Sequence, residues 1–513
     1  LEALDEADAA QLVRLASPVD LLPDQIAHVA NQAAGHPLFL RELAEAFEDA
    51  SEAELPESVT ALVASRIDRL PPTDRAVLRS ASVLGARFER GLLRELVPAA
   101  DLRPLREFMT EDGPTVRFRQ DLFRQTAYDS LPFRQRRLLH ASVARVLEAD
   151  AGEANDAVLS FHLFHAQAYD RAFERARRAA DDARARLAFG DAATLYRRAV
   201  QAARHVRTLG PPELAATWKY LGDVLTRLGR MSQASDAFRA ARRLVADDPL
   251  ELSRLLLLEG QIRSEQGQLA PAMRWYRRGV AAIDGLPKSA DTRQCLARLR
   301  VAMARVYLAQ GAAGECARLA SEAAGAAAGI EDVITLAHAY AVLGVVAAAT
   351  GDPAGAEHYQ RALGLYRAAG DPMGVGNVLN NLGMQAYFAG DMQEASRLYG
   401  ESRDALAAAG ALVASAITAN NLGEILSDQG RLDEAEAVFT EALSTLRAAG
   451  VWYEHYAVRN LGLVAQRRGD VDLARVLFTD ALDGFASVRA TDEVTATEKM
   501  LAEVGPVLAP VPG

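Results

Sequence analysis

The sequence predicts an all-α protein in which two small helical regions, the second with a short β hairpin, precede a long solenoid of helical hairpins. Three observations lead to this prediction. Half of the residues are hydrophobic but only 6% are aromatic, and alanine is abundant, which is typical of helices packed on helices. A chain of 513 residues is too long for one core. A pattern of glycine, small and aromatic residues also returns several times in the C-terminal half.

The repeat is clearest in three copies that begin at Gly383, Gly423 and Gly462, which are 40 and 39 residues apart. In each copy a second Gly follows after seven residues, a small residue after five more, an aromatic residue after four more and a small residue after three more. Small residues let two helix backbones approach closely, and the aromatic side chain fills the remaining space. Each copy therefore predicts a helix, a tight turn and a second helix.

This register resembles that of the tetratricopeptide repeat (TPR). The usual TPR period is about 34 residues, so each helix is expected to be roughly one turn longer here. Less regular copies precede the strong ones around Gly190, Gly222, Gly260, Ala304 and Gly344. We expect a TPR superhelix of about eight hairpins over residues 151–490, built as a one-dimensional stack. A capping helix and a Pro-rich tail are expected over residues 491–513.

The N-terminal 150 residues read as helices with one hairpin. In residues 1–50, Gly35 can end one helix and Pro37 suits the first turn of the next. Asp112, Gly113 and Pro114 predict a turn before an alternating strand at residues 115–119. Amphipathic helices are predicted over residues 56–70, 74–84, 90–96 and 102–110, and from Asp121 and Pro132. Three short helices with such a hairpin indicate a small winged-helix domain over residues 51–150.

Six segments in this order resemble the C-terminal part of a bacterial STAND signalling ATPase. They are residues 35–40 (GHPLFL), 55–59 (LPESV), 66–71 (RIDRLP), 117–122 (RFRQDL), 127–128 (AY) and 136–140 (RRLLH). The similarity is to the class associated with nucleotide cyclases and large LuxR-type regulators. It implies a helical lid over residues 1–50, then a winged helix and a TPR sensor. Because the chain begins at Leu1 without a methionine, we interpret it as a fragment of a longer protein.

The same resemblance implies where ATP or ADP would be contacted in an intact parent protein. In that family the lid segment lies against adenine, which by match falls on His36, Pro37 and Leu38. The family's winged helix often places a His before an Asp to sense the diphosphate. Gln120 and Asp121 stand here instead, and glutamine can donate a hydrogen bond but carries no charge. Phosphate sensing by Gln120 is therefore an open question.

No phosphate-binding loop is present in the sequence. A Walker A motif needs glycines whose N–H groups cradle phosphate and a lysine directly after a glycine. The three lysines are Lys219, Lys288 and Lys499, and none follows a glycine. We therefore expect the fragment to have no ATPase activity and no cofactor of its own, and to depend on an NTPase domain elsewhere in the parent.

Other residue patterns indicate no catalytic or metal site. His162 and His165 share a helix face, but no further ligands accompany them, so packing or surface roles are expected. Cys295 and Cys316 are too few for a disulfide framework and indicate a reduced, cytoplasmic setting. No apolar run of about 18 residues and no signal peptide were recognised, so no membrane association is expected. The net charge of −11 excludes a general attraction to nucleic acid.

A local basic run leaves one alternative open. Winged helices often bind DNA, although docking of this run on the absent ATPase domain is the favoured interpretation, and nucleic acid is not expected as a partner of this fragment. The run consists of Arg117, Arg119, Arg124, Arg134, Arg136, Arg137 and Arg145.

Asparagines recur near the middle of successive first helices, at Asn380, Asn381, Asn420, Asn421 and Asn460. First helices line the inner wall of a TPR superhelix, and an amide can both donate to and accept from a peptide backbone. The alternative is that the asparagines bond between adjacent repeats, which is favoured for the second Asn of each pair. We expect the first of each pair, Asn380 and Asn420, to face an effector groove.

The sequence thus predicts a regulatory sensor fragment. Its TPR superhelix would bind a protein, peptide or small-molecule effector on the concave face and control a missing NTPase and output domain, a cyclase or a transcriptional module. The alternatives are a free-standing TPR interaction scaffold and a DNA-binding transcriptional regulator acting through the winged helix.

Overall fold

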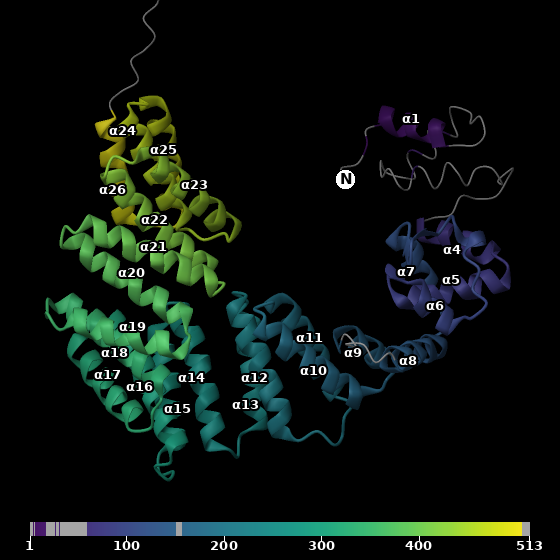
Figure 1. Cartoon of the computed structure of the whole chain (residues 1–513), viewed down its shortest axis with the longest axis horizontal. Coiled ribbons are helices and arrows are strands. Elements are labelled where there is room, and N and C mark those ends of the chain that lie inside the picture. Colours follow the sequence, from purple (N-terminus) through teal and green to yellow (C-terminus); the bar gives the residue numbers. More distant parts are fainter. Residues whose placement is uncertain are drawn as a thin grey trace, which may run out of the picture. The chain divides into compact units, whose positions relative to one another are not determined.

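The computed structural model of the chain describes residues 4, 6–16, 26, 30, 40, 59–149 and 156–504 (Figure 1). The chain divides into two compact units, Leu1–Leu228 and Gly229–Gly513. Helices dominate both units, and the predicted all-α fold ending in a TPR-like solenoid is confirmed. Of the predicted lid, only α1 (Glu6–Ala16) is described as an element, with Val13 fully buried. His36, Pro37 and Leu38 lie outside the described residues.

A small domain follows in unit 1. α4 (Val59–Arg69) and α5 (Pro72–Leu84) are separated by Pro71, and Pro72 suits a first helical turn because an N–H there would have no partner in the helix. The other elements are β1 (Arg87–Glu89), α6 (Arg90–Leu96), the 3₁₀ turn η2 (Arg103–Leu105), β2 (Met109–Asp112), β3 (Thr115–Phe118), α7 (Asp121–Asp129) and α8 (Phe133–Ala149). One core buries Ile67 and Leu78 with Phe108 and Phe123.

The three strands form an antiparallel sheet in the order β1-β3-β2. Phe88 pairs with Val116, and Met109 pairs with Phe118, so the apolar residues of the sheet face the core. β2 and β3 form the predicted hairpin, whose turn contains Gly113 at φ 60°. The description of this domain as a winged helix stays a prediction.

The helix expected over residues 102–110 is wrong. Only η2 is helical there, and residues from Met109 onward pair with β3. Leu105, Phe108 and Met109 have a spacing that suits a helix, and all three are buried, but by a single turn followed by a strand. The partner strand β3 lies outside residues 102–110, so the spacing within this segment could not reveal the pairing.

α8 connects this domain to the helices that follow in unit 1. It packs against α5 and α6 on one side and against α9 (Asp156–His165) on the other. Next come α10 (Tyr169–Ala185), α11 (Phe189–Ala203) and α12 (Pro211–Arg227). A core cluster that includes Ala144, Leu159, Phe173 and Ala199 joins α8 to the start of the solenoid.

Unit 2 is a solenoid of alternating first and second helices. The three strong sequence copies cover α20 to α25, and these helices are 17 residues long except α24, which has 15 residues. Its helices are α13 (Met231–Leu244), α14 (Pro249–Glu265), α15 (Leu269–Ile283), α16 (Ala290–Ala309), α17 (Ala313–Ala328), α18 (Val333–Thr350), α19 (Gly355–Ala369), α20 (Pro372–Phe388), α21 (Met392–Ala408), α22 (Leu412–Asp428), α23 (Leu432–Ala448), α24 (Glu454–Arg468), α25 (Val471–Ser487) and α26 (Thr491–Glu503). α26 is the expected capping helix.

The repeated glycine and aromatic residue meet as predicted. A Cβ at Gly423 would lie 2.6 Å from the ring of Phe439, which is 1% exposed. Such a distance is too short for a side chain, so glycine allows the two helices of the hairpin to approach. Gly430 then takes φ 77° in the turn, a left-handed conformation that favours glycine.

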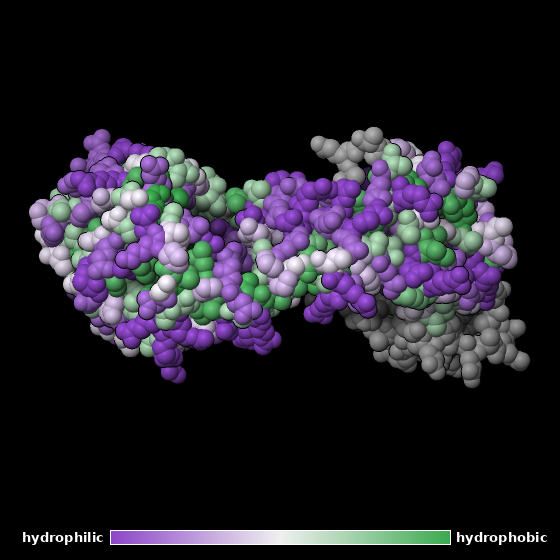
Figure 2. All heavy atoms as spheres, turned by 90° about the horizontal axis from the view of Figure 1, so that it is seen from below, coloured by the Kyte–Doolittle hydropathy of each residue, from purple (hydrophilic) through white to green (hydrophobic). Residues whose placement is uncertain are grey.

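One helix corrects the expectation that no segment has membrane-spanning length. Among the described residues, α18 is long and apolar enough by length and composition, with no Asp, Glu, Lys or Arg in its 18 residues. In the structure it packs against α16, α17, α19 and α20, and its Ala337 and Ala339 are fully buried. Its apolar composition is explained by packing on several sides within the solenoid. On the face of the molecule in Figure 2, hydrophobic side chains are interspersed among hydrophilic ones.

Candidate functional site

The first helices of unit 2 pack in two runs, α14 to α20 and α22 to α24, and hydrogen bonds between α20 and α22 join the two runs. α14 contacts α16, α16 contacts α18, α18 contacts α20, and α22 contacts α24. Within residues 231–504, no two second helices share a contact of similar extent. Elements on the inside of a curved stack lie closer together than those outside, so the first helices form the inner layer.

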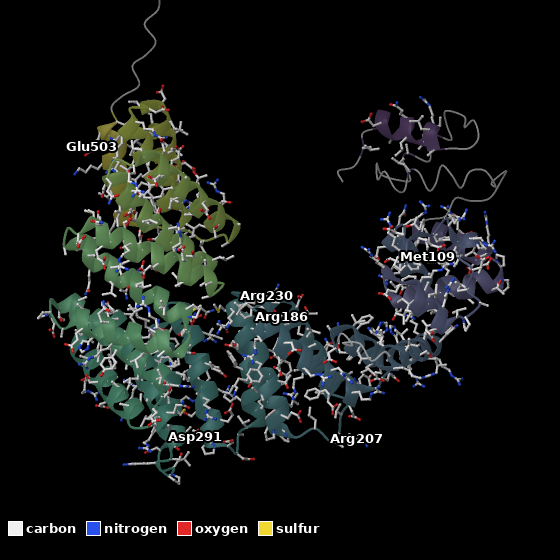
Figure 3. The ribbon with its side chains drawn as sticks, viewed as in Figure 1. Met109, Arg186, Arg207, Arg230, Asp291 and Glu503 are labelled. Carbon is white, nitrogen blue, oxygen red and sulfur yellow. The ribbon has the colours of Figure 1, made fainter. Side chains whose placement is uncertain are left out.

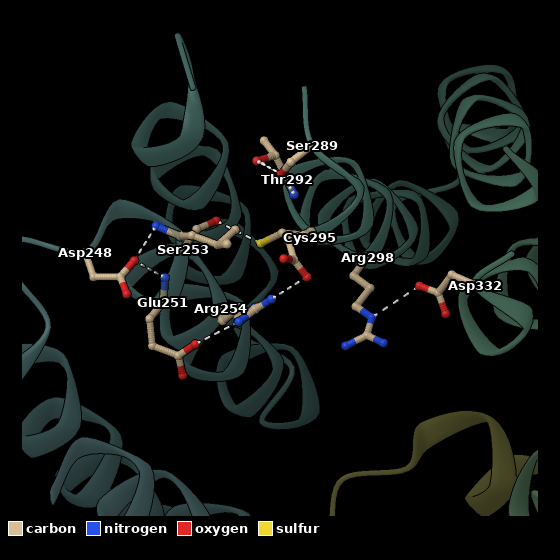
Figure 4. Close-up of polar contacts among 11 residues, drawn as sticks. Asp248, Glu251, Ser253, Arg254, Ser289, Thr292, Cys295, Arg298 and Asp332 are labelled. Atoms are coloured by element: carbon tan, nitrogen blue, oxygen red, sulfur yellow. Dashed lines mark hydrogen bonds and ion pairs between the residues drawn. The ribbon is translucent and has the colours of Figure 1, made fainter. Parts of the chain in front are cut away.

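Polar contacts hold neighbouring first helices in place (Figure 4). Arg254 on α14 donates to Glu251 on its own helix and to Asp291 on α16, at 3.2 and 3.4 Å. Ser253 lies 3.2 Å from the Cys295 sulfur, and burial raises the pKa of that thiol, so it stays protonated. Both cysteines are free and buried, as expected for structural thiols. These contacts position the start of the inner layer.

The predicted asparagines form a network between repeats. Asn421 Nδ2 on α22 donates to Asn380 Oδ1 on α20 at 3.3 Å. Asn460 Nδ2 on α24 donates to Asn420 Oδ1 on α22 at 3.2 Å. Asn381 hydrogen-bonds to Tyr359, which lies in the preceding hairpin. The asparagines therefore connect helices that are far apart in sequence but adjacent in the stack.

The expectation that Asn420 faces a groove is wrong. Asn420 is fully buried and Asn460 is 2% exposed, so neither amide is available to an effector. The side chain of Asn420 is directed at α24 instead, and a buried amide is tolerated because its hydrogen bonds are made. Asn380, Asn381 and Asn421 are half-buried, and their contact with an effector stays a prediction.

Glu424 is at the centre of this network, although no pattern in the sequence predicts it. Its Oε1 accepts hydrogen bonds from Asn460 Nδ2 at 2.8 Å and from Asn420 Nδ2 at 3.2 Å. Burial raises the pKa of Glu424, and the two amides and the charge of Arg459 act in the opposite direction. Glu424 thus links α22 to α24 through a largely buried carboxyl group.

Two further polar groups extend the network along the inner layer. Tyr387 on α20 donates to Asp428 on α22, and Asp428 accepts from Arg467 on α24 at 2.6 Å. Arg459 pairs with Glu493 on α26, and its guanidinium lies 5.0 Å from the ring centre of Tyr456. Every helix from α20 to α26 that belongs to the inner layer is tied to its neighbour.

One face of α20 remains open beside this network. Asn380, Met384 and Phe388 follow one another at intervals of four residues, so they lie on the same side of the helix. Met384 is 41% exposed and Phe388 is 78% exposed. An exposed aromatic side chain that is aligned with a methionine and an amide offers both apolar and hydrogen-bonding contact to a partner. This stripe on α20 is the strongest candidate contact surface in unit 2.

The two residues implied for nucleotide sensing lie at the start of α7. Gln120 precedes the helix, and its buried Oε1 has no hydrogen-bond partner among the described residues. Asp121 is exposed and paired with Arg124 at 2.7 Å, and this pairing holds the pKa of its carboxyl below the usual value. The role of Gln120 and Asp121 in nucleotide sensing stays a prediction.

Much of the basic run is engaged within the chain. Arg136 donates to the carbonyl of Leu131 and its guanidinium lies 5.1 Å from the Tyr128 ring centre, while Arg137 donates to Gln167. Arg117, Arg119 and Arg124 also have internal partners. These bonds use donors that contacts to DNA phosphates would need.

His162 and His165 pack against a third histidine that the sequence did not suggest. His140 Nδ1 on α8 lies 2.9 Å from His162 Nδ1 on α9, and the ring of His140 stacks on His165 at 4.8 Å between centres. Burial and neighbouring positive charge lower the pKa of His140 to about 3 and that of His162 to about 4. The packing interpretation is confirmed for His162, which is 3% exposed, and no metal-binding group was found in the described part of the chain.

Several solved structures are similar to this chain. A signal transduction ATPase with numerous domains (STAND) with a tetratricopeptide repeat sensor, from Pyrococcus horikoshii, aligns over 97% of this chain and 75% of its own at 13% identity, with a TM-score of 0.45. Aspartyl phosphate phosphatase F from Bacillus subtilis aligns over 66% and 97% at 14% identity and a TM-score of 0.37. The apo form of the quorum sensor NprR from B. thuringiensis aligns over 65% and 98% at 11% identity and a TM-score of 0.39.

A search of curated proteins found no match to this chain. A family model described as tetratricopeptide repeat matches residues 374–448. This segment spans all but the first two residues of α20 and the whole of α21 to α23, so it includes the open stripe of α20 and most of the asparagine network. The helices that carry the candidate contact surface are therefore tetratricopeptide repeats.

Proposed function

We propose that this chain is the regulatory sensor region of a STAND signalling ATPase. Its TPR superhelix binds a protein or peptide effector on the inner layer of first helices and controls an NTPase and an output domain, a cyclase or a transcriptional module, elsewhere in the parent. The assignment to the STAND class rests on the sequence resemblance. The binding role rests on one observation, the exposed stripe of Asn380, Met384 and Phe388 on a tied array of helices.

The physical argument favours a peptide segment as the effector. Burying a side chain such as Met384 or Phe388 contributes about 1.5–3 kcal/mol. Asn380 can bond to a peptide backbone next to these apolar contacts, as extended or helical segments bound in grooves require. The network around Glu424 keeps the neighbouring helices in fixed positions, which lowers the entropic cost of binding.

We also propose that the chain acts in the cytoplasm, without catalysis and without a cofactor of its own. The free thiols of Cys295 and Cys316 support the cytoplasmic setting, and the lack of a lysine directly after a glycine supports the lack of ATPase activity. ATP or ADP would be bound by the parent protein, with the lid and Gln120 and Asp121 near it.

Selection of a random dodecapeptide phage library on the whole chain tests the binding role. Peptides that are enriched should bind in fluorescence anisotropy, and Phe388→Ala should weaken this binding at least tenfold. Val476→Ala is the matched control, because Val476 is 65% exposed but lies on the second helix α25. The proposal fails if no peptide is enriched, or if Phe388→Ala binds the selected peptides as tightly as the control.

The STAND assignment has a separate test in the parent gene. Walker A and Walker B sequences are expected upstream of the codon for Leu1. If the parent gene lacks both sequences, the chain is a TPR interaction scaffold and the control of an NTPase is refuted, whatever the peptide selection shows.

A further inference from the structure

Unit 1 contains a cavity of about 1430 Å³ between the small N-terminal domain and the helices α9, α10 and α11. Ligand pockets usually enclose 300–1,000 Å³, so this space is large enough for a small molecule. The charged residues that line it are Arg124, Arg175, Arg178, Arg186, Arg198, Asp156, Asp182 and Asp191. Five positive and three negative side chains leave a surplus of two positive charges, within a chain whose net charge is −11.

Arg198 on α11 donates hydrogen bonds to uncharged oxygen atoms. Its Nη1 donates to the carbonyl of Ala157 at 2.9 Å and to Ser160 Oγ at 2.8 Å, both on α9. Among the described residues no carboxylate pairs with it, and burial lowers the pKa of its guanidinium. A guanidinium has five N–H donors, and a buried charge is costly unless it is paired. Arg198 can therefore pair with an external anion, because the described part of the chain supplies no carboxylate for it.

The only acidic residue on α9 in the cavity wall is already neutralised. Asp156 accepts hydrogen bonds from Arg175 at 2.8 Å and from Arg178 at 2.9 Å, so two positive side chains surround this one carboxylate. Arg186 follows α10 at the same cavity and is labelled in Figure 3. Asp182 and Asp191 also line the cavity, but among the described residues neither forms an ion pair with Arg198.

Apolar side chains line the cavity beside Arg198. The ring of Phe161 lies 5.4 Å from the Arg198 guanidinium, and Phe161 and Val158 are 38% and 43% exposed. His162 and His165 complete this wall, and the ring of His165 lies 4.4 Å from that of Phe161. A ligand here would meet a positive charge and an aromatic surface at the same place.

We propose that this cavity binds a small molecule that carries a phosphate or carboxylate group beside an apolar or planar portion. The anionic group pairs with Arg198, and the apolar portion lies against Phe161 and Val158. The site lies wholly in unit 1, and it does not depend on the effector surface proposed for α20. The chain would accordingly respond to two chemically different signals.

Calorimetric titration of the whole chain with four probes tests the proposal. The probes are phenyl phosphate, benzoate, inorganic phosphate and the uncharged benzyl alcohol. Phenyl phosphate or benzoate should bind at least tenfold more tightly than benzyl alcohol, and the tighter of the two identifies the anionic group. If the aromatic anion also binds more tightly than inorganic phosphate, the apolar wall contributes to the affinity. The proposal is overturned if neither aromatic anion binds more tightly than benzyl alcohol at concentrations up to 10 mM, roughly the weak limit for small ligands.

Two variants locate the binding. Arg198→Gln should weaken binding of the tighter probe at least tenfold, whereas Arg204→Gln should change it less than twofold. Arg204 follows the same helix, is exposed and does not line the cavity. If Arg198→Gln does not fold, Val158→Trp replaces an exposed cavity residue and should block binding by filling the space. Unchanged affinity in a folded Arg198→Gln or Val158→Trp variant refutes the site.

Discussion

The cavity wall of unit 1 and the inner layer of unit 2 both place polar groups in poorly hydrated surroundings, but they resolve the cost differently. In unit 2, Asn420, Asn460 and Glu424 form hydrogen bonds with one another, and Arg459 has Glu493. In unit 1, the histidines are kept neutral and Arg198 has no counter-ion among the described residues. Satisfied polar groups hold a scaffold together, whereas an unpaired charge marks a place where a ligand can add stability.

The repeat period explains the difference. Asn421 and Asn460 each stand two residues before the repeat glycine, and each donates to the first asparagine of the hairpin before it, Asn380 and Asn420. Residues that recur with the repeat therefore form the same bond between successive hairpins. The junction at α8 and α9 has no such symmetry, because α8 belongs to the small domain. There, neighbouring side chains come from unrelated segments, and complementarity is not supplied by repetition.

The largest expected effect is a difference in pH dependence. The folded-state pKa of His162 is about 4 against about 6.5 when unfolded, so the unfolded chain binds the proton more readily between these values. Stability of unit 1 is therefore full above pH 6.5 and is lost as the pH falls toward 4, by on the order of 3 kcal/mol. Urea unfolding at pH 7 and pH 4.5 measures it, and His162→Phe should flatten the dependence. If the free energy of unfolding changed equally between pH 7 and pH 4.5 in the variant and the wild type, this account would be contradicted.

Glu424 should act in the opposite direction. Its pKa is raised on folding, so its contribution to stability is present at low pH and is lost as the pH rises through the folded-state value. Glu424→Gln keeps the shape and one oxygen acceptor, and it should remove this part of the pH dependence. Urea unfolding at pH 4.5 and pH 7 measures the effect. As the pH rises, the free energy of unfolding of the variant should change by a more favourable amount than that of the wild type, because the variant has no Glu424 contribution to lose.

The next effect concerns the satisfied network. Asn460→Leu removes both bonds donated by Asn460 and leaves the buried Asn420 Oδ1 without that donor, which should cost about 2–3 kcal/mol in the free energy of unfolding. Asn377→Leu on α20 is the control, because Asn377 is exposed and should change stability by less than about 0.5 kcal/mol. If both variants lost a similar amount of free energy of unfolding, the hydrogen bonds of Asn460 would contribute no more to stability than an exposed asparagine does.

Replacing an arginine by methionine should change the free energy of unfolding in opposite directions in the two regions. Arg459→Met removes the ion pair to Glu493, which keeps its hydrogen bond from the Tyr456 hydroxyl, and should destabilise the chain by about 1–2 kcal/mol. Arg198→Met removes a half-buried charge that has no carboxylate partner among the described residues, and it should stabilise the unliganded chain by about 1 kcal/mol, despite the loss of two hydrogen bonds to uncharged acceptors. Thermal unfolding without added anions compares the two. If both variants were less stable than the wild type, Arg198 would stabilise the unliganded chain as Arg459 does, and the proposed difference between the two arginines would be wrong.

The smallest effect is expected at the open stripe. Phe388→Ala should alter the free energy of unfolding by less than about 0.5 kcal/mol, because Phe388 is 78% exposed. Circular dichroism during urea titration gives the value. A loss of several kcal/mol would mean that Phe388 supports the fold. Weaker peptide binding by this variant would then be explained by unfolding and not by the loss of a contact with the peptide.

The sequence alone was sufficient for the repeat and its packing rule. Glycine, small and aromatic residues at fixed spacing specify which helix faces meet, since Gly423 must admit the ring of Phe439 and Gly430 must adopt a left-handed turn. These are local constraints within one hairpin, and local constraints are recorded in residue spacing. The hairpin at residues 109–118 was predicted only in part, because Met109 is a strand residue by virtue of its pairing with Phe118.

Only the tertiary structure decided which polar side chains are buried together. Asn420 and Asn380 occupy the same position in successive repeats, yet Asn420 is fully buried and Asn380 is half-buried, because α24 covers one and α22 does not fully cover the other. His140 reaches His162, and Arg198 reaches Ala157, across separate helices. Such contacts depend on how helices stack, and the free energy of a buried polar group depends on neighbours that may lie anywhere in the chain.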